Sequence, residues 1–84
     1  MPKPCSLDGK KNLISANLIE QRRKHNLSQR DLANKLQLMG YDIDKNVITR
    51  IETQQRYVTD IELQALCQLF NISFEDFVSN EKKN

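Results

Sequence analysis

Residues 42–52, DIDKNVITRIE, contain a short helical pattern in which Ile48 and Ile51 are apolar and lie three positions apart among mainly polar and cationic residues. Asp44 stands just before the pattern and can accept hydrogen bonds from the free backbone N–H groups of a first helical turn. The stretch therefore predicts a helix over about 45–54. Because so short a helix is marginal on its own, neighbouring helices must hold it through its narrow apolar stripe.

Two helices are predicted before this stretch. Apolar residues recur at helical spacing over about 11–25, which predicts a first helix. Ser28 is followed three residues later by Asp31, a pattern that resembles a capping box, although Asp replaces the usual Glu or Gln. A second helix is therefore expected over about 29–39.

Two more helices are predicted after it. Thr59 and Glu62 form another capping box, which opens a fourth helix with the broadest apolar face in the chain. Its apolar residues are Ile61, Leu63, Leu66, Cys67, Leu69 and Phe70. Asn71 follows as a terminator, and Ser73 caps a short fifth helix. No convincing strand alternation occurs, so the sequence predicts an all-α bundle of five helices.

The composition is that of an ordinary soluble domain. The 84 residues suit one domain with a modest core, and 29% charged residues with a formal charge of +2 do not select a partner. Cys67 lies in an apolar helical run, where a free thiol acts as a small hydrophobe, so we expect a reduced, intracellular protein. No apolar run approaches a membrane span, and the first residues lack the apolar centre of a signal peptide. We expect a loose arm over 1–10, a folded domain over 11–79 and a frayed tail over 80–84.

Side chains suited to catalysis or metal binding are sparse. His25 is the single histidine and has no cysteine or acidic cluster at ligand spacing, so we expect a helix-end residue rather than a metal ligand. The two glycines, Gly9 and Gly40, are too few for a phosphate-binding loop. We therefore expect no enzyme, no metal, no cofactor and no small-molecule ligand.

The outward face of the predicted 45–54 helix is more informative. It carries Lys45, Asn46, Thr49 and Arg50. Lysine and arginine can donate to guanine, asparagine can pair bidentately with adenine, and threonine offers both a hydroxyl and a methyl group. Taken alone, the same residues also serve to keep a surface helix in water. A capped helix, a turn and a short polar-faced helix, flanked by further helices, is nevertheless the order in which helix-turn-helix proteins dock on DNA.

Three segments carry a resemblance to a known family. They are RRKHNLSQRDLANKL at 22–36, NVITRIETQQR at 46–56 and ELQALCQLFNISFEDF at 62–77. Together they resemble the phage repressor and Cro-type helix-turn-helix family, also called the XRE family, over about residues 14–78. The resemblance implies a compact five-helix bundle of the lambda-repressor-like type, with the helix-turn-helix formed by the second and third helices.

The resemblance also implies roles for individual residues. The positions of base-edge contacts fall on Lys45, Asn46, Thr49 and Arg50, and those of phosphate contacts on Gln29, Arg30, Gln55 and Arg56. A structural ion pair is implied between Arg22, at the end of the first helix, and Glu52, at the end of the third.

The chain departs from the family pattern in two places. The linker at 37–44, QLMGYDID, is longer than in the shortest members, so the second helix is expected to gain a turn before Gly40 reverses the chain. Gln54 stands where a glycine is expected and must accept a left-handed conformation or a different turn, at some cost. Asp42 and Asp44 also add negative charge beside the proposed DNA surface.

These observations predict a sequence-specific regulator of transcription that binds double-stranded DNA, most simply a repressor. We expect it in the cytoplasm, at the nucleoid of a bacterium or encoded by a phage. One reading helix covers few base pairs, so a homodimer on a pseudo-palindromic operator is expected. Phe74, Phe77 and Val78 are most simply core residues, and their surplus apolar surface is the candidate dimer patch.

A rival interpretation is a protein-interaction module on the same scaffold, such as an antitoxin or an anti-repressor partner. The modest net charge and the acidic pair Asp42 and Asp44 favour it. Salt separates the two, because DNA binding weakens steeply as salt rises and a largely apolar protein interface does not. A single domain of a larger repressor or enzyme is a third alternative.

Overall fold

A computed structural model describes residues 10–79 of the chain and contains five helices in that part, with no strand. They are α1 (Ser15–Lys24), α2 (Gln29–Leu38), α3 (Lys45–Glu52), α4 (Asp60–Phe70) and α5 (Phe74–Val78). The all-α prediction is confirmed. Most of the expected N-terminal arm and the whole of the expected C-terminal tail lie outside the described residues. Within residues 10–79, no helix is long and apolar enough to cross a membrane.

Helices α2, α3, α4 and α5 begin where the sequence places capping residues. The Ser28 hydroxyl accepts a hydrogen bond from the Asp31 N–H at 2.9 Å, and the Asp31 carboxylate accepts one from the Ser28 N–H at 3.2 Å. Thr59 and Glu62 make the same reciprocal pair at the start of α4. Asp44 accepts from the N–H of the third residue of α3 at 2.9 Å. These side chains satisfy N–H groups that have no partner inside the helix, which fixes the first turns of α2, α3 and α4.

Four helices end in the same way, with one residue in the left-handed region. These residues are Asn26, Gly40, Gln54 and Asn71, with φ between 54° and 99°. In each case the next N–H bonds to the carbonyl five residues earlier, as Leu27 does to Arg22 and Gln55 does to Arg50. This is the Schellman arrangement, which satisfies the last carbonyl groups of a helix. Of the two alternatives expected for Gln54, a left-handed conformation or a different turn, the structure has the left-handed conformation.

The first helix is shorter than predicted. It begins at Ser15 rather than near Lys11 and ends before His25, which is its C-cap. Asn12 explains the late start, because its buried side chain donates to the carbonyls of Ile51 at 3.0 Å and Arg56 at 3.2 Å. The residues before α1 are therefore held against the end of α3 instead of continuing the helix.

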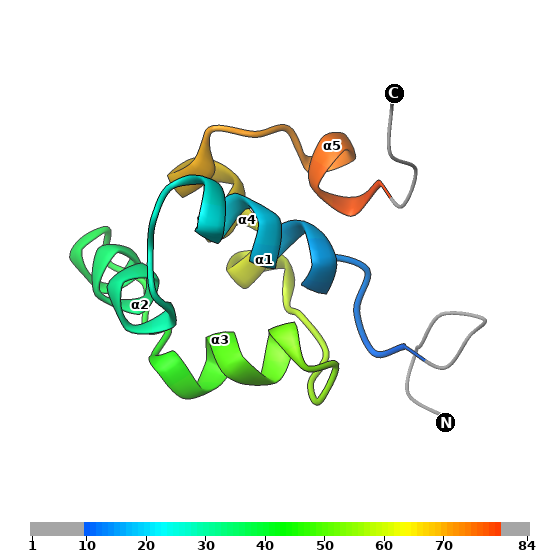
Figure 1. The fold of residues 1–84 in the computed structure, drawn as a ribbon, viewed down its shortest axis with the longest axis horizontal. Helices are drawn as coiled ribbons and strands as arrows, with labels where there is room; N and C mark the ends of the chain where they lie inside the picture. Colours follow the sequence, from blue (N-terminus) through cyan, green and yellow to red (C-terminus); the bar gives the residue numbers. More distant parts are fainter. Residues whose placement is uncertain (1–9, 80–84) are drawn as a thin grey trace.

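The core is built from the predicted apolar faces. Its largest fully buried members are Leu18, Leu32, Leu36, Ile48, Ile51, Leu66 and Phe77. The stripe of α3 is thus entirely buried, and α3 packs against both α1 and α2. It runs along one edge of the molecule, with α5 at the opposite edge (Figure 1). Ile61 was predicted to belong to the apolar face of α4, but it lies in the first turn of the helix and is 61% exposed.

Candidate nucleic-acid interface

The solvent-facing side of α3 carries the residues expected to contact bases. Lys45, Asn46 and Arg50 are exposed, and their side chains make no hydrogen bond or ion pair within residues 10–79. Thr49 is half-buried and lies on the side of α3 that faces α2. Successive residues of a helix are rotated by about 100°, so Thr53 falls on this same face, between Thr49 and Arg50.

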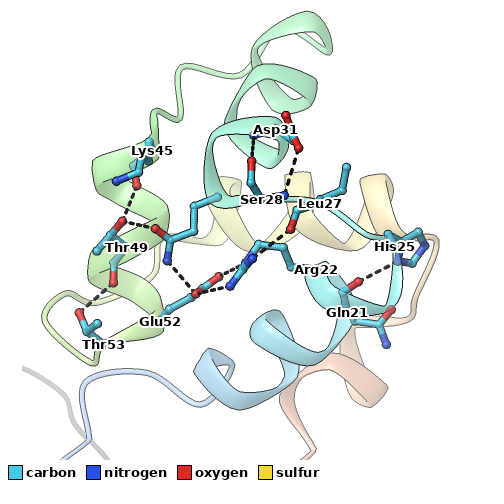
Figure 2. A network of polar contacts seen from close by, with 11 residues as sticks. Gln21, Arg22, His25, Leu27, Ser28, Asp31, Lys45, Thr49, Glu52 and Thr53 are labelled. Atoms are coloured by element: carbon cyan, nitrogen blue, oxygen red, sulfur yellow. Dashed lines mark hydrogen bonds and ion pairs between the residues drawn. The ribbon is translucent and has the colours of Figure 1, made fainter.

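Thr53 is a residue of this face that the sequence interpretation left out. It is exposed, caps the C-terminal end of α3, and donates its hydroxyl to the Thr49 carbonyl at 2.8 Å. Figure 2 shows Lys45, Thr49 and Thr53 following one another along the helix. The sequence signal that could have identified Thr53 is its helical spacing, seven residues after Asn46 and three after Arg50.

A bidentate ion pair joins α1 to α3 beneath this face. The Arg22 Nε donates to Glu52 Oε2 at 2.7 Å and its Nη2 donates to Glu52 Oε1 at 3.1 Å. The two side chains are 13% and 4% exposed. Arg22 also donates to the Leu27 carbonyl at 3.0 Å, so the guanidinium ties together the turn after α1 and the end of α3 (Figure 2). The structure thus brings together the two residues expected to pair.

Gln29 extends this pair to the second helix. Its Nε2 donates to Glu52 Oε1 at 2.9 Å, and its Oε1 accepts from the Thr49 hydroxyl at 2.7 Å. Gln29 is the first residue of α2 and is half-buried. Through Arg22, Glu52, Gln29 and Thr49, one continuous chain of hydrogen bonds connects α1, α2 and α3. It sets the position of α3 relative to the start of α2.

The start of α2 and the loop after α3 hold the residues expected to contact phosphates. Arg30 and Gln55 are exposed, and their side chains have no hydrogen-bond or ion-pair partner within residues 10–79. Arg56 is different, because its Nη2 forms an ion pair with Glu62 and its Nε donates to the Tyr57 carbonyl at 3.2 Å. The Arg56 guanidinium is thereby turned toward the first turn of α4.

Gln54 fastens the same loop to the residues before α1. Its Oε1 accepts from the N–H groups of Lys11 at 3.0 Å and Asn12 at 3.1 Å. Its Nε2 donates to the Asn12 carbonyl at 3.1 Å and to the Ser15 hydroxyl at 2.9 Å. A glycine would suit the left-handed backbone better but would lose these four bonds. This role could not be predicted from the sequence, because the partners of Gln54 lie about forty residues earlier in the chain.

Charges near α3 are of both signs. The Asp44 carboxylate caps α3, where the partial positive charge of a helix N-terminus favours an anion. At the start of α2, hydrogen bonds from the backbone and then the side chain of Ser28 lower the pKa of Asp31. Lys45 and Arg50 provide the exposed positive charge on α3.

Within residues 10–79, no three His, Cys, Asp or Glu side chains gather in a way that could hold a metal ion.

The expected dimer patch is smaller than the sequence suggested. Phe77 is fully buried, which confirms its prediction as a core residue and leaves it no surface for the patch. The prediction of Phe74 as a core residue was wrong, because Phe74 is 59% exposed, and Val78 is half-buried. Both line an apolar groove of about 390 Å³ together with Leu13 and Leu63. The short α5 must turn one face inward to close the core, and Phe77 occupies that face.

Comparison with known proteins agrees with this geometry. A family model described as "Helix-turn-helix" matches residues 18–77, which is most of the chain and includes α2, α3 and their turn. No curated protein and no solved structure matched the chain. Members of the matched family are DNA-binding regulators. The chain belongs to the XRE-type helix-turn-helix family, the family of the phage repressors and Cro.

Proposed function

We propose that the protein is a sequence-specific regulator of transcription in which α3 enters the major groove of DNA and reads base edges. The observation that carries this proposal is the division of α3 into two faces. Ile48 and Ile51 are fully buried, whereas Lys45, Asn46 and Arg50 are exposed and have no side-chain partner within residues 10–79. Unpaired donors on a rigidly held helix suit the donor and acceptor pattern of the major groove.

Phosphate contacts on both sides of α3 would fix its register on the duplex. Gln29 opens α2, and one hydrogen of its amide nitrogen remains after the bond to Glu52. Arg30 beside it is exposed, and Gln55 in the loop after α3 faces solvent. Arg56 keeps N–H donors besides those bound to Glu62 and Tyr57, so it remains a candidate with a weaker expected contribution.

Repression is the simplest regulatory outcome, because a protein that occupies a promoter blocks access to it. A helix of eight residues reads few base pairs, so a homodimer on a pseudo-palindromic operator would supply the missing specificity. Phe74 and Val78 are the residues of the expected patch that remain available for such a contact. This activity would place the protein at the nucleoid, in the cytoplasm of a bacterium or of a phage-infected cell.

The second candidate function is a protein-interaction module, and one surface favours it. At the end of α2, Leu38 is 87% exposed, and Met39 beside it is also exposed. Both line a groove together with Leu27 and Leu69. Exposed apolar side chains of this kind are more usual in protein contacts than in DNA contacts.

Selection from a randomised duplex library at near-physiological salt tests the proposed function. The expected result is enrichment of one site with two-fold symmetry, whose spacing gives the geometry of the dimer. Binding to that site should weaken linearly in log–log terms as salt rises. Absence of enrichment by a protein shown to be folded by circular dichroism would favour the protein-interaction module instead.

A further inference from the structure

The hydroxyl of Thr49 lies between two acceptors of its own chain. Its Oγ1 is 2.7 Å from Gln29 Oε1 and 3.0 Å from the Lys45 carbonyl oxygen. A hydroxyl has one hydrogen to donate and two lone pairs that accept. Whichever neighbour takes the hydrogen, none is left for a group outside the protein.

The direction of the bond to Gln29 is set by the ion pair behind it. The ionised Glu52 carboxylate is only an acceptor, so the Gln29 nitrogen must face it, and the Gln29 oxygen must face Thr49. Two facing oxygens 2.7 Å apart need a hydrogen between them, and only the threonine hydroxyl can supply it. Arg22 holds Glu52 in this arrangement with two further bonds. The position of Glu52, held by Arg22, thus determines that the Thr49 hydroxyl donates its hydrogen to Gln29.

We propose that Thr49 acts as a hydrogen-bond acceptor only, and that it selects a base presenting an amino group in the major groove. Such groups are the N6 amino group of adenine and the N4 amino group of cytosine. The guanine O6 and N7 atoms and the thymine O4 atom are acceptors, and the Thr49 hydroxyl has no hydrogen to give them. This inference rests on the proposed function, since it requires α3 to lie in the major groove.

The competing mode of contact is apolar. A threonine methyl group can pack against the C5 methyl group of thymine, which would also produce a preference for an A·T pair. Base preference alone therefore does not separate the two modes, because adenine and thymine occur in the same pair. Base analogues do separate them, because the amino group and the methyl group can be removed one at a time.

The first step locates the contact by library selection with the wild-type chain, Thr49→Val and Thr49→Ser. Valine keeps the shape and removes the oxygen, whereas serine keeps the oxygen and removes the methyl group. The Thr49→Val variant should lose the preference at one position in each half-site, and Thr49→Ser should keep it. Thr53→Val is the comparison variant: it removes a neighbouring hydroxyl of the same face, so any change in base preference that it causes should fall at a different position from the one assigned to Thr49.

The second step measures binding to synthetic operators altered at that position. Where the base is adenine, 2-aminopurine keeps the pair with thymine but moves the amino group to the minor groove, and uracil in place of thymine removes the methyl group. Where the base is cytosine, pyrimidin-2-one removes the amino group. Loss of the amino group should weaken wild-type binding roughly two- to twelve-fold, the range of one hydrogen bond, and should not affect Thr49→Val.

Three outcomes oppose the inference. Full wild-type binding to the amino-deleted operator, with weaker binding to the uracil operator, would show a methyl contact instead. A Thr49→Val variant that keeps every base preference would show that Thr49 reads nothing. Failure to enrich any site would overturn the proposed function itself and the inference with it. The analogue measurements on the wild-type chain need no variant, so they do not depend on whether a substituted chain folds.

Discussion

Gln29 and Glu52 are joined by a hydrogen bond of 2.9 Å between the first residue of α2 and the last residue of α3. The same carboxylate oxygen accepts from Arg22, so the end of α3 is connected to both preceding helices through one side chain. A residue expected to touch DNA, Gln29, is therefore also part of the internal structure. Substitutions at the interface must be judged by stability as well as by binding.

Glu52→Ala should destabilise the fold. The substitution leaves the nearly buried Arg22 guanidinium without its partner, a change that typically costs about 3–5 kcal/mol. Thermal unfolding followed by circular dichroism measures the loss. Glu20→Ala is the matched control, because Glu20 is an exposed glutamate of α1 and its removal should change stability little. A melting temperature for Glu52→Ala equal to that of the wild type would disprove the structural role of the pair.

Gln54 should show a definite order of stability among three side chains. Gln54→Ala loses four hydrogen bonds and keeps the cost of a left-handed conformation. Gln54→Gly loses the same bonds but removes that cost, which is roughly 1–2 kcal/mol for a residue with a Cβ atom. We expect the wild type to be most stable, glycine next and alanine last, in urea unfolding curves. An alanine variant as stable as the glycine variant would mean that the backbone at this position is not strained.

The sequence predicted the local parts of the fold better than the distant ones. The capping residues at Ser28 and Thr59 were readable because a cap and its target N–H lie three positions apart. The late start of α1 was not, because Asn12 finds its partners at Ile51 and Arg56, which only the folded chain brings near. The exposure of Phe74 was not predicted either, because it depends on how α5 docks, which a five-residue pattern does not encode.

The candidate site shows the same division. The outward position of Lys45, Asn46 and Arg50 follows from helical periodicity once the buried stripe of α3 is known. The internal bonds of Thr49 do not follow from it, because they depend on where α2 places Gln29. The sequence interpretation therefore took the Thr49 hydroxyl to be free, whereas in the structure it donates its hydrogen to Gln29.

Asp31 should contribute stability that disappears in acid. Its pKa in the folded chain is lowered from the ordinary value of 3.8 by hydrogen bonds from Ser28. A carboxyl whose pKa is lowered by folding adds stability above its unfolded pKa, and that stability is lost as the pH falls through the folded value. The stability difference between the wild type and Asp31→Asn should therefore be present at neutral pH, begin to shrink near pH 3.8, and vanish at lower pH. Urea unfolding across that range measures it. A difference that does not change between neutral pH and strong acid would contradict the role of the ionised carboxylate.

Arg56→Ala should affect binding less than Arg30→Ala if both act on phosphates. Arg56 is already paired with Glu62, whereas Arg30 is exposed and its side chain has no hydrogen-bond or ion-pair partner within residues 10–79. Removing a phosphate contact weakens binding to all sequences alike and reduces the slope of log affinity against log salt by about one. Titrations on specific and random duplexes at several salt concentrations measure both quantities. An unchanged salt slope for Arg30→Ala would remove Arg30 from the phosphate contacts.

Arg50→Ala should change specificity rather than general affinity. The Arg50 side chain is exposed on α3 and is expected to donate to a base edge, an interaction that discriminates by about 1–3 kcal/mol against the wrong base. The variant should lose its preference at one position in each half-site, while its binding to random DNA falls only by the loss of one positive charge. Arg23→Ala is the matched control, because Arg23 is an exposed arginine in the last turn of α1, away from α3 in sequence and not expected to reach DNA. Equal losses on specific and random duplexes would reassign Arg50 from the bases to the phosphate backbone, and α3 would then read the groove through Asn46 and its neighbours alone.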